Sequence, residues 1–177
     1  MTAPKALSKA PLIFNFLTFQ AGWFACVLGA AHGKPWLGPL VVSVITAVWL
    51  IVAPRPRALA WLILLAGVVG LCWDSWLLVM GLIGYPPGPV TPPLAPLWIL
   101  ALWALLATTL HLSMRWLQNQ LLLAALLGAI AAPMSYLGGA QLGALTLVKV
   151  QPALWAQACG WALLLPLLLR LARRLDA

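Results

Sequence analysis

Charged residues are scarce in this sequence. They make up 7% of its 177 residues, whereas hydrophobic residues make up 64%. A soluble domain carries roughly 25% charged and about 45–50% apolar residues, because its surface must be hydrated. This shortage of charge excludes an ordinary soluble globular domain and indicates a protein whose surface faces lipid.

Groups that bind metals or carry out acid–base chemistry are also few. The chain has two acidic residues, two histidines and three cysteines. Cys26, Cys72 and Cys159 lie in apolar segments without Cys-x-x-Cys spacing, which is typical of small hydrophobic residues. A P-loop, a dinucleotide fingerprint and a Gly-x-Ser-x-Gly elbow are all missing. We expect neither a metal site nor a cofactor.

An alternating apolar and polar pattern, which barrel strands require, is missing from the long Leu/Ala-rich runs at 101–106 and 121–132. Apolar stretches of about 20 residues match the bilayer core, where helices satisfy their own backbone groups. The sequence therefore predicts an all-α, polytopic transmembrane bundle forming one domain over residues 1–177. Its six expected spans cover residues 12–31, 37–53, 58–83, 97–114, 121–147 and 152–169.

The first span follows a short basic tail and resembles a signal peptide. Its apolar run is longer than the ~7–15 residues of a typical signal sequence, so we expect it to be retained. Residues 85–96 contain six prolines and predict a stiff, extended connector. Pro133 and Gly138-Gly139 predict a kink or a break in the fifth span.

The basic residues predict the orientation. With six spans and both termini in the cytoplasm, two lysines lie outside, Lys34 and Lys149. The other eight lie inside: Lys5, Lys9, Arg55, Arg57, Arg115, Arg170, Arg173 and Arg174. This division satisfies the positive-inside rule and predicts a multi-pass membrane protein with both termini in the cytoplasm. Since the cations are explained as span-orienting residues, the net charge of +8 does not predict nucleic-acid binding.

Polar residues inside the spans are candidate site residues, since their burial in lipid is costly. Counting about 1.5 Å per residue from Arg57 places Asp74 roughly 25 Å from the cytoplasmic edge. The same count groups other polar residues near Asp74 in an outer layer. The predicted ligand-binding residues are Asp74, Ser75, Ser135, Tyr136, Gln157 and Gln20.

A second polar cluster is expected near the cytoplasmic edge. His111 lies only about 6 Å from that edge, too far from Asp74 to form an acid–base pair with it. The residues of this inner cluster are Asn15, Thr108 and His111. Deep tryptophans, Trp49, Trp73, Trp76 and Trp103, need either a packing role or a partner for the indole N–H.

Asp74 has two interpretations. It is either a structural carboxyl that bonds to polar side chains of neighbouring helices, or a site for a proton, a cation or a polar headgroup. His111 is either an interfacial helix cap or a functional group. Asn15 and Gln20 fit interhelical hydrogen bonds.

Several segments together resemble an uncharacterised bacterial inner-membrane family, domain of unknown function 2878. They are NFLTFQAGWFAC at 15–26, PW at 35–36, DS at 74–75, PLW at 96–98 with Trp103, TTLH at 108–111 and PMSYLGG at 133–139. The family has no assigned activity, so the resemblance supplies no catalytic residues. Its genes often neighbour those for cyclopropane-type fatty-acid modification, which implies partners among membrane lipids and lipid-modifying proteins.

Three hypotheses remain open. The first is a non-enzymatic membrane protein that binds or moves a lipid or small molecule at Asp74 and the outer layer. The second is a membrane-embedded enzyme, or enzyme subunit, that modifies fatty-acyl lipids with the same residues. The third is a scaffold in which the polar residues only hold helices together.

Overall fold

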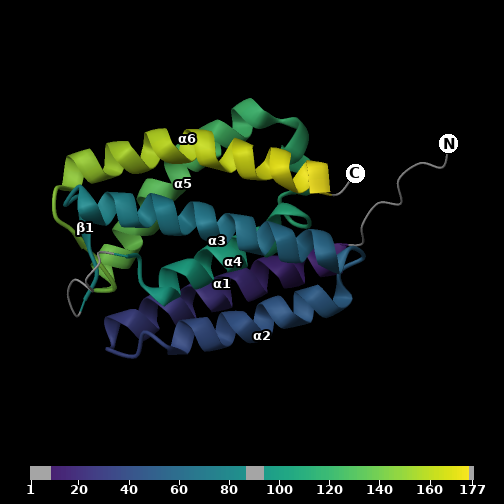
Figure 1. Cartoon of the computed structure of the whole chain (residues 1–177), viewed down its shortest axis with the longest axis horizontal. Coiled ribbons are helices and arrows are strands. Elements are labelled where there is room, and N and C mark those ends of the chain that lie inside the picture. The colour runs from purple at the N-terminus through teal and green to yellow at the C-terminus, as the bar shows by residue number, and fades with distance from the viewer. Residues whose placement is uncertain (1–8, 87–93, 176–177) are drawn as a thin grey trace.

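The computed structural model describes residues 9–86 and 94–175. Their long helices lie side by side along the long axis of the molecule, and the start of the first helix and the end of the last lie at the same end (Figure 1). The described α-helices are α1 (Lys9–Ala31), α2 (Leu37–Val52), α3 (Pro56–Val79), α4 (Leu97–Leu110), α5 (Leu121–Gln141) and α6 (Val150–Leu175). The predicted helical bundle is confirmed.

The outer surface of the bundle is apolar. Ile51, Leu122 and Leu163 are each at least 75% exposed, far from the behaviour of large aliphatic side chains in a water-soluble protein. In the described part of the chain, α1, α3, α5 and α6 are long and apolar enough to cross a membrane, and α2 and α4 are shorter apolar helices. The fold is therefore that of a transmembrane bundle.

Helix α4 forms the centre of the bundle. Eight of its 14 residues are buried, and it packs against α1, α2 and α3. A helix that is apolar on every face is stable where other helices surround it. This placement explains why α4 needs only 14 residues: its neighbours, and not lipid, cover most of its surface.

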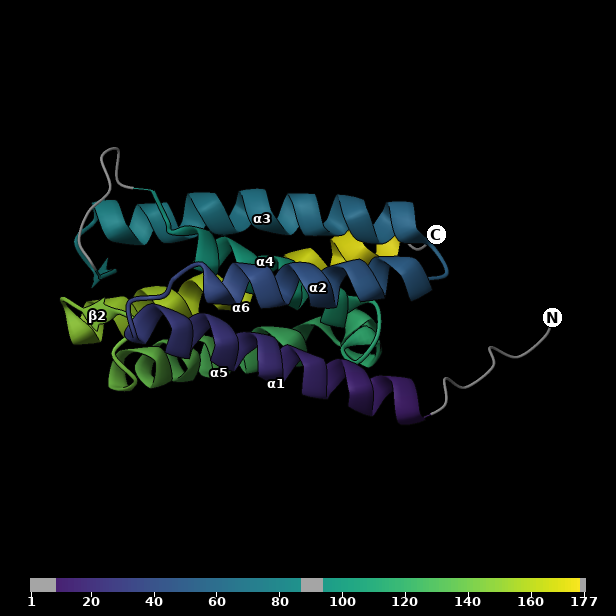
Figure 2. The same ribbon diagram turned by 90° about the horizontal axis from the view of Figure 1, so that it is seen from below.

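Two connections meet at the end of the bundle that carries Lys34 and Lys149. Strand β1 (Ile83–Gly84) pairs antiparallel with β2 (Thr146–Leu147), and Val148 N donates to Leu82 O at 3.0 Å. Gly81 and Gly143 adopt φ values of 61° and 85°, which turn the chain out of α3 and α5. This strand pair joins the loop after α3 to the loop after α5; β1 is labelled at the left of Figure 1 and β2 at the left of Figure 2.

Helix α5 is continuous from Leu121 to Gln141, with Pro133 in its interior. The helix therefore runs past Pro133 and Gly138-Gly139 without the predicted break and ends at Gln141, whereas the alternative, a kink, stays a prediction. A proline inside a packed membrane helix removes one backbone donor while the surrounding turns keep their own bonds.

The other end of the bundle carries a short 3₁₀-helix, η1 (Arg115–Asn119), between α4 and α5. Arg173 of α6 donates to Asn119 Oδ1 at 3.0 Å and links the two elements. The predicted stiff connector at 85–96 falls largely on residues 87–93, which lie outside the described residues, as do the basic tail with Lys5 and the last two residues.

Candidate binding cavity and its polar ends

A cavity of about 390 Å³ lies between α1, α4, α5 and α6. Its volume falls within the ~300–1,000 Å³ of typical small-molecule pockets. Two of its lining residues are exposed, Phe16 on α1 and Ala131 on α5. The cavity therefore reaches the outer surface of the bundle between these two helices.

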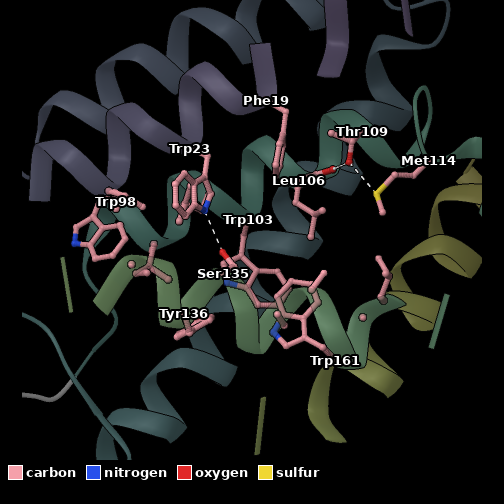
Figure 3. Close-up of a pocket in the computed structure, with 18 of the residues that line it drawn as sticks. Phe19, Trp23, Trp98, Trp103, Leu106, Thr109, Met114, Ser135, Tyr136 and Trp161 are labelled. Atoms are coloured by element: carbon pink, nitrogen blue, oxygen red, sulfur yellow. Dashed lines mark hydrogen bonds between the residues drawn. The ribbon is translucent and has the colours of Figure 1, made fainter. Parts of the chain in front are cut away.

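The cavity exists because small residues on one helix face large ones on others. One face of α5 contributes Gly128, Ala131, Ala132, Ser135 and Gly139, spaced three and four residues apart. The opposite walls carry aromatic rings, among them Phe19 and Trp23 on α1 and Trp103 on α4 (Figure 3). Short side chains on α5 leave a space that the rings border without filling.

The cavity wall is uncharged. None of the described lining residues is Asp, Glu, Lys, Arg or His. Trp23 Nε1 donates to Ser135 Oγ at 3.1 Å, and this bond joins α1 to α5 across the cavity (Figure 3). Such a wall suits an apolar ligand that carries few polar atoms.

The Asp74 carboxyl lies directly behind this wall and is fully buried. Trp103 Nε1 donates to Oδ2 at 2.7 Å, and Tyr85 and Tyr136 hydroxyls donate to Oδ1, Tyr85 at 3.0 Å. We call Asp74, Tyr85, Trp103 and Tyr136 the outer cluster. Trp103 and Tyr136 line the cavity, whereas Asp74 does not, so Asp74 contacts the cavity only through these two side chains.

Tyr85, outside the helices, closes the outer cluster from the loop after β1. Burial, reinforced by the neighbouring Asp74 carboxyl, raises the pKa of the Tyr85 hydroxyl well above its ordinary value. Its proton therefore stays in place at neutral pH, and Tyr85 acts as a hydrogen-bond donor. Its ring also packs edge-on against Trp98, with ring centroids 5.6 Å apart.

The Trp103 ring is held by contacts with two other helices. It lies against Gly70 of α3, where an added Cβ would overlap the indole, and stacks on Trp161 of α6 with centroids 4.8 Å apart. Gly70 is thus required as the recess that admits the ring. Asp74 sets the orientation of the indole N–H, and the ring forms part of the cavity wall.

Gln157 of α6 extends the outer cluster. Its side chain is fully buried, its Oε1 accepts from Trp73 Nε1 at 3.3 Å, and it interacts with Tyr136. Its Nε2 has no hydrogen bond of ordinary geometry within the described residues. Of the six residues predicted for the outer layer, Asp74, Tyr136 and Gln157 therefore come together.

The remaining predicted outer residues lie elsewhere. Ser75 Oγ accepts from the Ala95 backbone N–H at 3.0 Å and anchors the segment before α4. Ser135 lines the cavity and bonds to Trp23 rather than to Asp74. Gln20 is half-buried on α1 and does not line the cavity.

The inner cluster, as the structure has it, consists of Asn15, Thr108 and Ser113. Asn15 is fully buried, donates weakly to the Thr108 carbonyl at 3.4 Å and accepts from the Ser113 hydroxyl at 2.7 Å. Ser113 lines the cavity. His111 is the C-cap residue of α4, where its backbone N–H donates to the Thr109 carbonyl, and it is not among the hydrogen-bond partners of Asp74 in the described residues.

Three contributors were missed at the sequence level: Tyr85, Ser113 and Trp161. Tyr85 and Ser113 lie between helices, where a residue count based on helix geometry does not give the depth in the membrane. Trp161 lies on a predicted span but was not distinguished from the other tryptophans, of which the chain has eleven. A group of three or more His, Cys, Asp or Glu side chains that could hold a metal ion is not found among the described residues.

A comparison with known protein families finds a match to this chain. The model of a family described as "Protein of unknown function (DUF2878)" matches residues 12–167. Neither the curated proteins nor the solved structures yield a match to this chain. The matched range takes in the cavity walls and both polar clusters, and the chain belongs to the DUF2878 family.

Proposed function

We propose that this protein binds the apolar chain of a membrane lipid in the cavity between α1 and α5. The observation that carries the proposal is the uncharged, mostly apolar cavity of about 390 Å³, bordered by several aromatic rings, that reaches the lipid-facing surface. An opening between two membrane helices admits an apolar chain sideways, from the bilayer. The apolar chain of the bound lipid would leave its contacts with other lipid tails and contact the aromatic rings of the cavity instead.

Asp74 supports this function as a positioning residue. Its two oxygens accept three hydrogen bonds from protein donors, and Trp103 and Tyr136 stand between it and the cavity. A ligand in the cavity would therefore touch Trp103 and Tyr136, whose orientation depends on Asp74.

The proposed setting is the bacterial inner membrane, with six spans and both termini in the cytoplasm. Exposed arginines at one end of the bundle support this orientation. They lie between α2 and α3, at the start of η1 and at the end of α6. The opposite end carries the exposed Lys34 and Lys149. This asymmetry follows the positive-inside rule.

Photolabelling tests the proposal directly. The full chain is reconstituted with phosphatidylcholine that carries a photoactivatable group midway along one acyl chain, and labelled residues are mapped by mass spectrometry. We expect labels on the cavity faces of α1 and α5, above the background labelling of exposed side chains. Labels confined to outward-facing residues such as Leu122 and Ile130 contradict the proposal.

A cavity-filling variant provides the matched test. Ala132→Phe places a ring into the cavity from α5, whereas Ala21→Phe adds the same ring to an exposed position on α1 that does not line it. Ala132→Phe should abolish cavity labelling, and Ala21→Phe should leave it intact. Size-exclusion profiles of both variants establish that the fold is retained.

A further inference from the structure

The cavity is open toward one end of the bundle. Phe16, in the first half of α1, is exposed, and the lining residues Phe19, Ser113 and Met114 are partly exposed. They lie toward the end of the bundle that carries six exposed arginines, which we call the arginine end: Arg55, Arg57, Arg115, Arg170, Arg173 and Arg174. A lipid chain therefore has access to the cavity from the half of the membrane nearest the arginine end.

The opposite end of the cavity is closed. Val27, Trp98 and Leu145 line it, and each is at most 5% exposed. Trp98 and Met114 lie at the two ends of the cavity in Figure 3. Phe16 and Val27 lie roughly 16 Å apart along α1, at about 1.5 Å per residue. An elongated space that is open at one end and closed at the other holds an apolar chain in one direction, with its terminal methyl group at the closed end.

An exposed cation stands beside the open end. Arg115 directly follows the lining residue Met114, so the two Cα atoms are about 3.8 Å apart. The Arg115 side chain is exposed and forms no hydrogen bond or ion pair with the other described residues. Asp74, the one acidic residue in the described part of the chain, is fully buried in the outer cluster. The Arg115 guanidinium therefore has no carboxylate partner in the described part of the chain and can bind a phosphate group with two parallel hydrogen bonds.

The charges at the arginine end also discriminate between lipid headgroups. A phosphatidylcholine headgroup carries a quaternary ammonium in addition to its phosphate, whereas a phosphatidylglycerol headgroup carries the phosphate charge alone. The described residues at this end contain six arginines and no Asp or Glu that would attract an ammonium group. A headgroup with a net negative charge is therefore favoured over a zwitterionic one.

We infer that the cavity takes an anionic phospholipid from the leaflet at the arginine end, with the lipid phosphate at Arg115 and the end of one acyl chain between Val27, Trp98 and Leu145. This inference rests on the proposed lipid-binding function and specifies the class and the direction of the ligand. In the proposed orientation of the protein, this leaflet is the cytoplasmic one.

The direction of the chain is tested with two photoactivatable phosphatidylglycerols, one with the reactive group beside the acyl ester and one with it at the chain terminus. The full chain is labelled with each in mixed micelles, and the sites are mapped by mass spectrometry. The ester-proximal group should label Phe16 and Met114, and the terminal group should label Val27 and Leu145. The reverse pattern, or the same cavity residues labelled by both probes, overturns the inferred direction.

The headgroup is tested by competition against the photoactivatable phosphatidylcholine. Unlabelled phosphatidylglycerol should halve cavity labelling at an about fivefold lower concentration than phosphatidylcholine with the same acyl chains, the effect of one basic residue at an anionic surface. Inorganic phosphate should leave the labelling unchanged. Displacement of the label by inorganic phosphate would indicate a site for free phosphate instead and overturn the inference.

Arg115→Gln should reduce the fivefold advantage of phosphatidylglycerol to less than twofold, and Arg115→Lys, which keeps the charge, should retain part of the advantage. Arg57→Gln is the matched control. It removes the same charge at the same end of the bundle, but from α3, which contributes none of the described lining residues. That variant should retain the full advantage, and size-exclusion profiles of all three establish that the fold is retained.

The outcomes distinguish failure of the inference from failure of the proposed function. Equal competition by the two phospholipids in the wild type, or equal losses of the advantage in Arg115→Gln and Arg57→Gln, overturns the inference and leaves lipid binding intact. Absence of cavity labelling in the wild type by all of the photoactivatable lipids overturns the proposed function itself.

Discussion

The outer and inner clusters border the same cavity and are built from different chemistry. The outer cluster gathers three aromatic donors around one carboxyl, and its members come from α3, α4, α5 and the loop after β1. The inner cluster uses one amide, one hydroxyl and one backbone carbonyl from α1, α4 and the turn after α4. The Asp74 carboxyl, which can carry a charge, thus has three hydrogen-bond donors around it, whereas the neutral Asn15 amide has two hydrogen-bond partners.

The comparison predicts unequal energetic weight. Loss of the Asp74 acceptor leaves three buried donors without a partner. Loss of Asn15 leaves only the Ser113 hydroxyl and the Thr108 carbonyl without a partner, and the hydrogen bond from Asn15 to that carbonyl is already long at 3.4 Å. The outer cluster should therefore contribute more than the inner cluster to the free energy of unfolding of the bundle.

The largest effect is expected for Asp74→Ala. It should lower the free energy of unfolding by about 3–5 kcal/mol, because each unpaired buried donor costs about 1–3 kcal/mol. Unfolding by sodium dodecyl sulfate in mixed micelles measures the loss. Asp74→Asn keeps one acceptor oxygen and should fall between the wild type and Asp74→Ala. A loss below about 1 kcal/mol for Asp74→Ala would show that the donors find other acceptors.

A smaller effect is expected for Gly70→Ala, which places a methyl group against the Trp103 ring. Forcing an extra carbon into packed space typically costs about 1–3 kcal/mol. The control is on the same helix: an added Cβ at Gly67 meets no atom within 4 Å. Gly67→Ala should be neutral or slightly stabilising through its helix propensity. Equal losses of unfolding free energy in Gly70→Ala and Gly67→Ala would show that the missing side chain at Gly70 does not position Trp103.

The smallest effect is expected at the inner cluster. Ser113→Ala removes the 2.7 Å bond to Asn15 and should cost about 0.5–1.5 kcal/mol. A double-mutant cycle of Asn15→Ala with Ser113→Ala isolates this bond, and typical interhelical hydrogen bonds in membranes average ~0.6 kcal/mol in such cycles. A coupling energy as large as the loss in Asp74→Ala would erase the distinction between the clusters.

Sequence reasoning succeeded where a residue's chemistry demanded a partner. The requirement that deep tryptophans pack or pair their indole N–H is confirmed: Trp49 donates to Thr18, Trp73 to Gln157 and Trp103 to Asp74. Trp76 stacks on Trp73 with centroids 5.2 Å apart. The apolar runs likewise predicted six helices, because backbone groups in lipid leave few alternatives.

The cavity could not be predicted in this way. It depends on which face of α5 meets α1 and α4, and depth along a helix contains no information about rotation around it. Ser135 and Tyr136 are adjacent in sequence and lie at the same depth, yet one bonds to α1 and the other to Asp74 on α3. Tyr85 was missed because it lies in the predicted proline-rich connector, where a residue count based on helix geometry gives no depth.

Helix α4 has a consequence for how the chain is made. At about 1.5 Å per residue, 14 residues extend roughly 21 Å, which falls short of a ~30 Å hydrocarbon core. The irregular turns beyond its ends can lie at membrane depth only where other segments shield their backbone groups. During synthesis α4 leaves the ribosome after α1, α2 and α3, against which it packs, and before α6, which also contacts it. We therefore expect the stable insertion of α4 to depend on the earlier helices α1, α2 and α3, which pack against it.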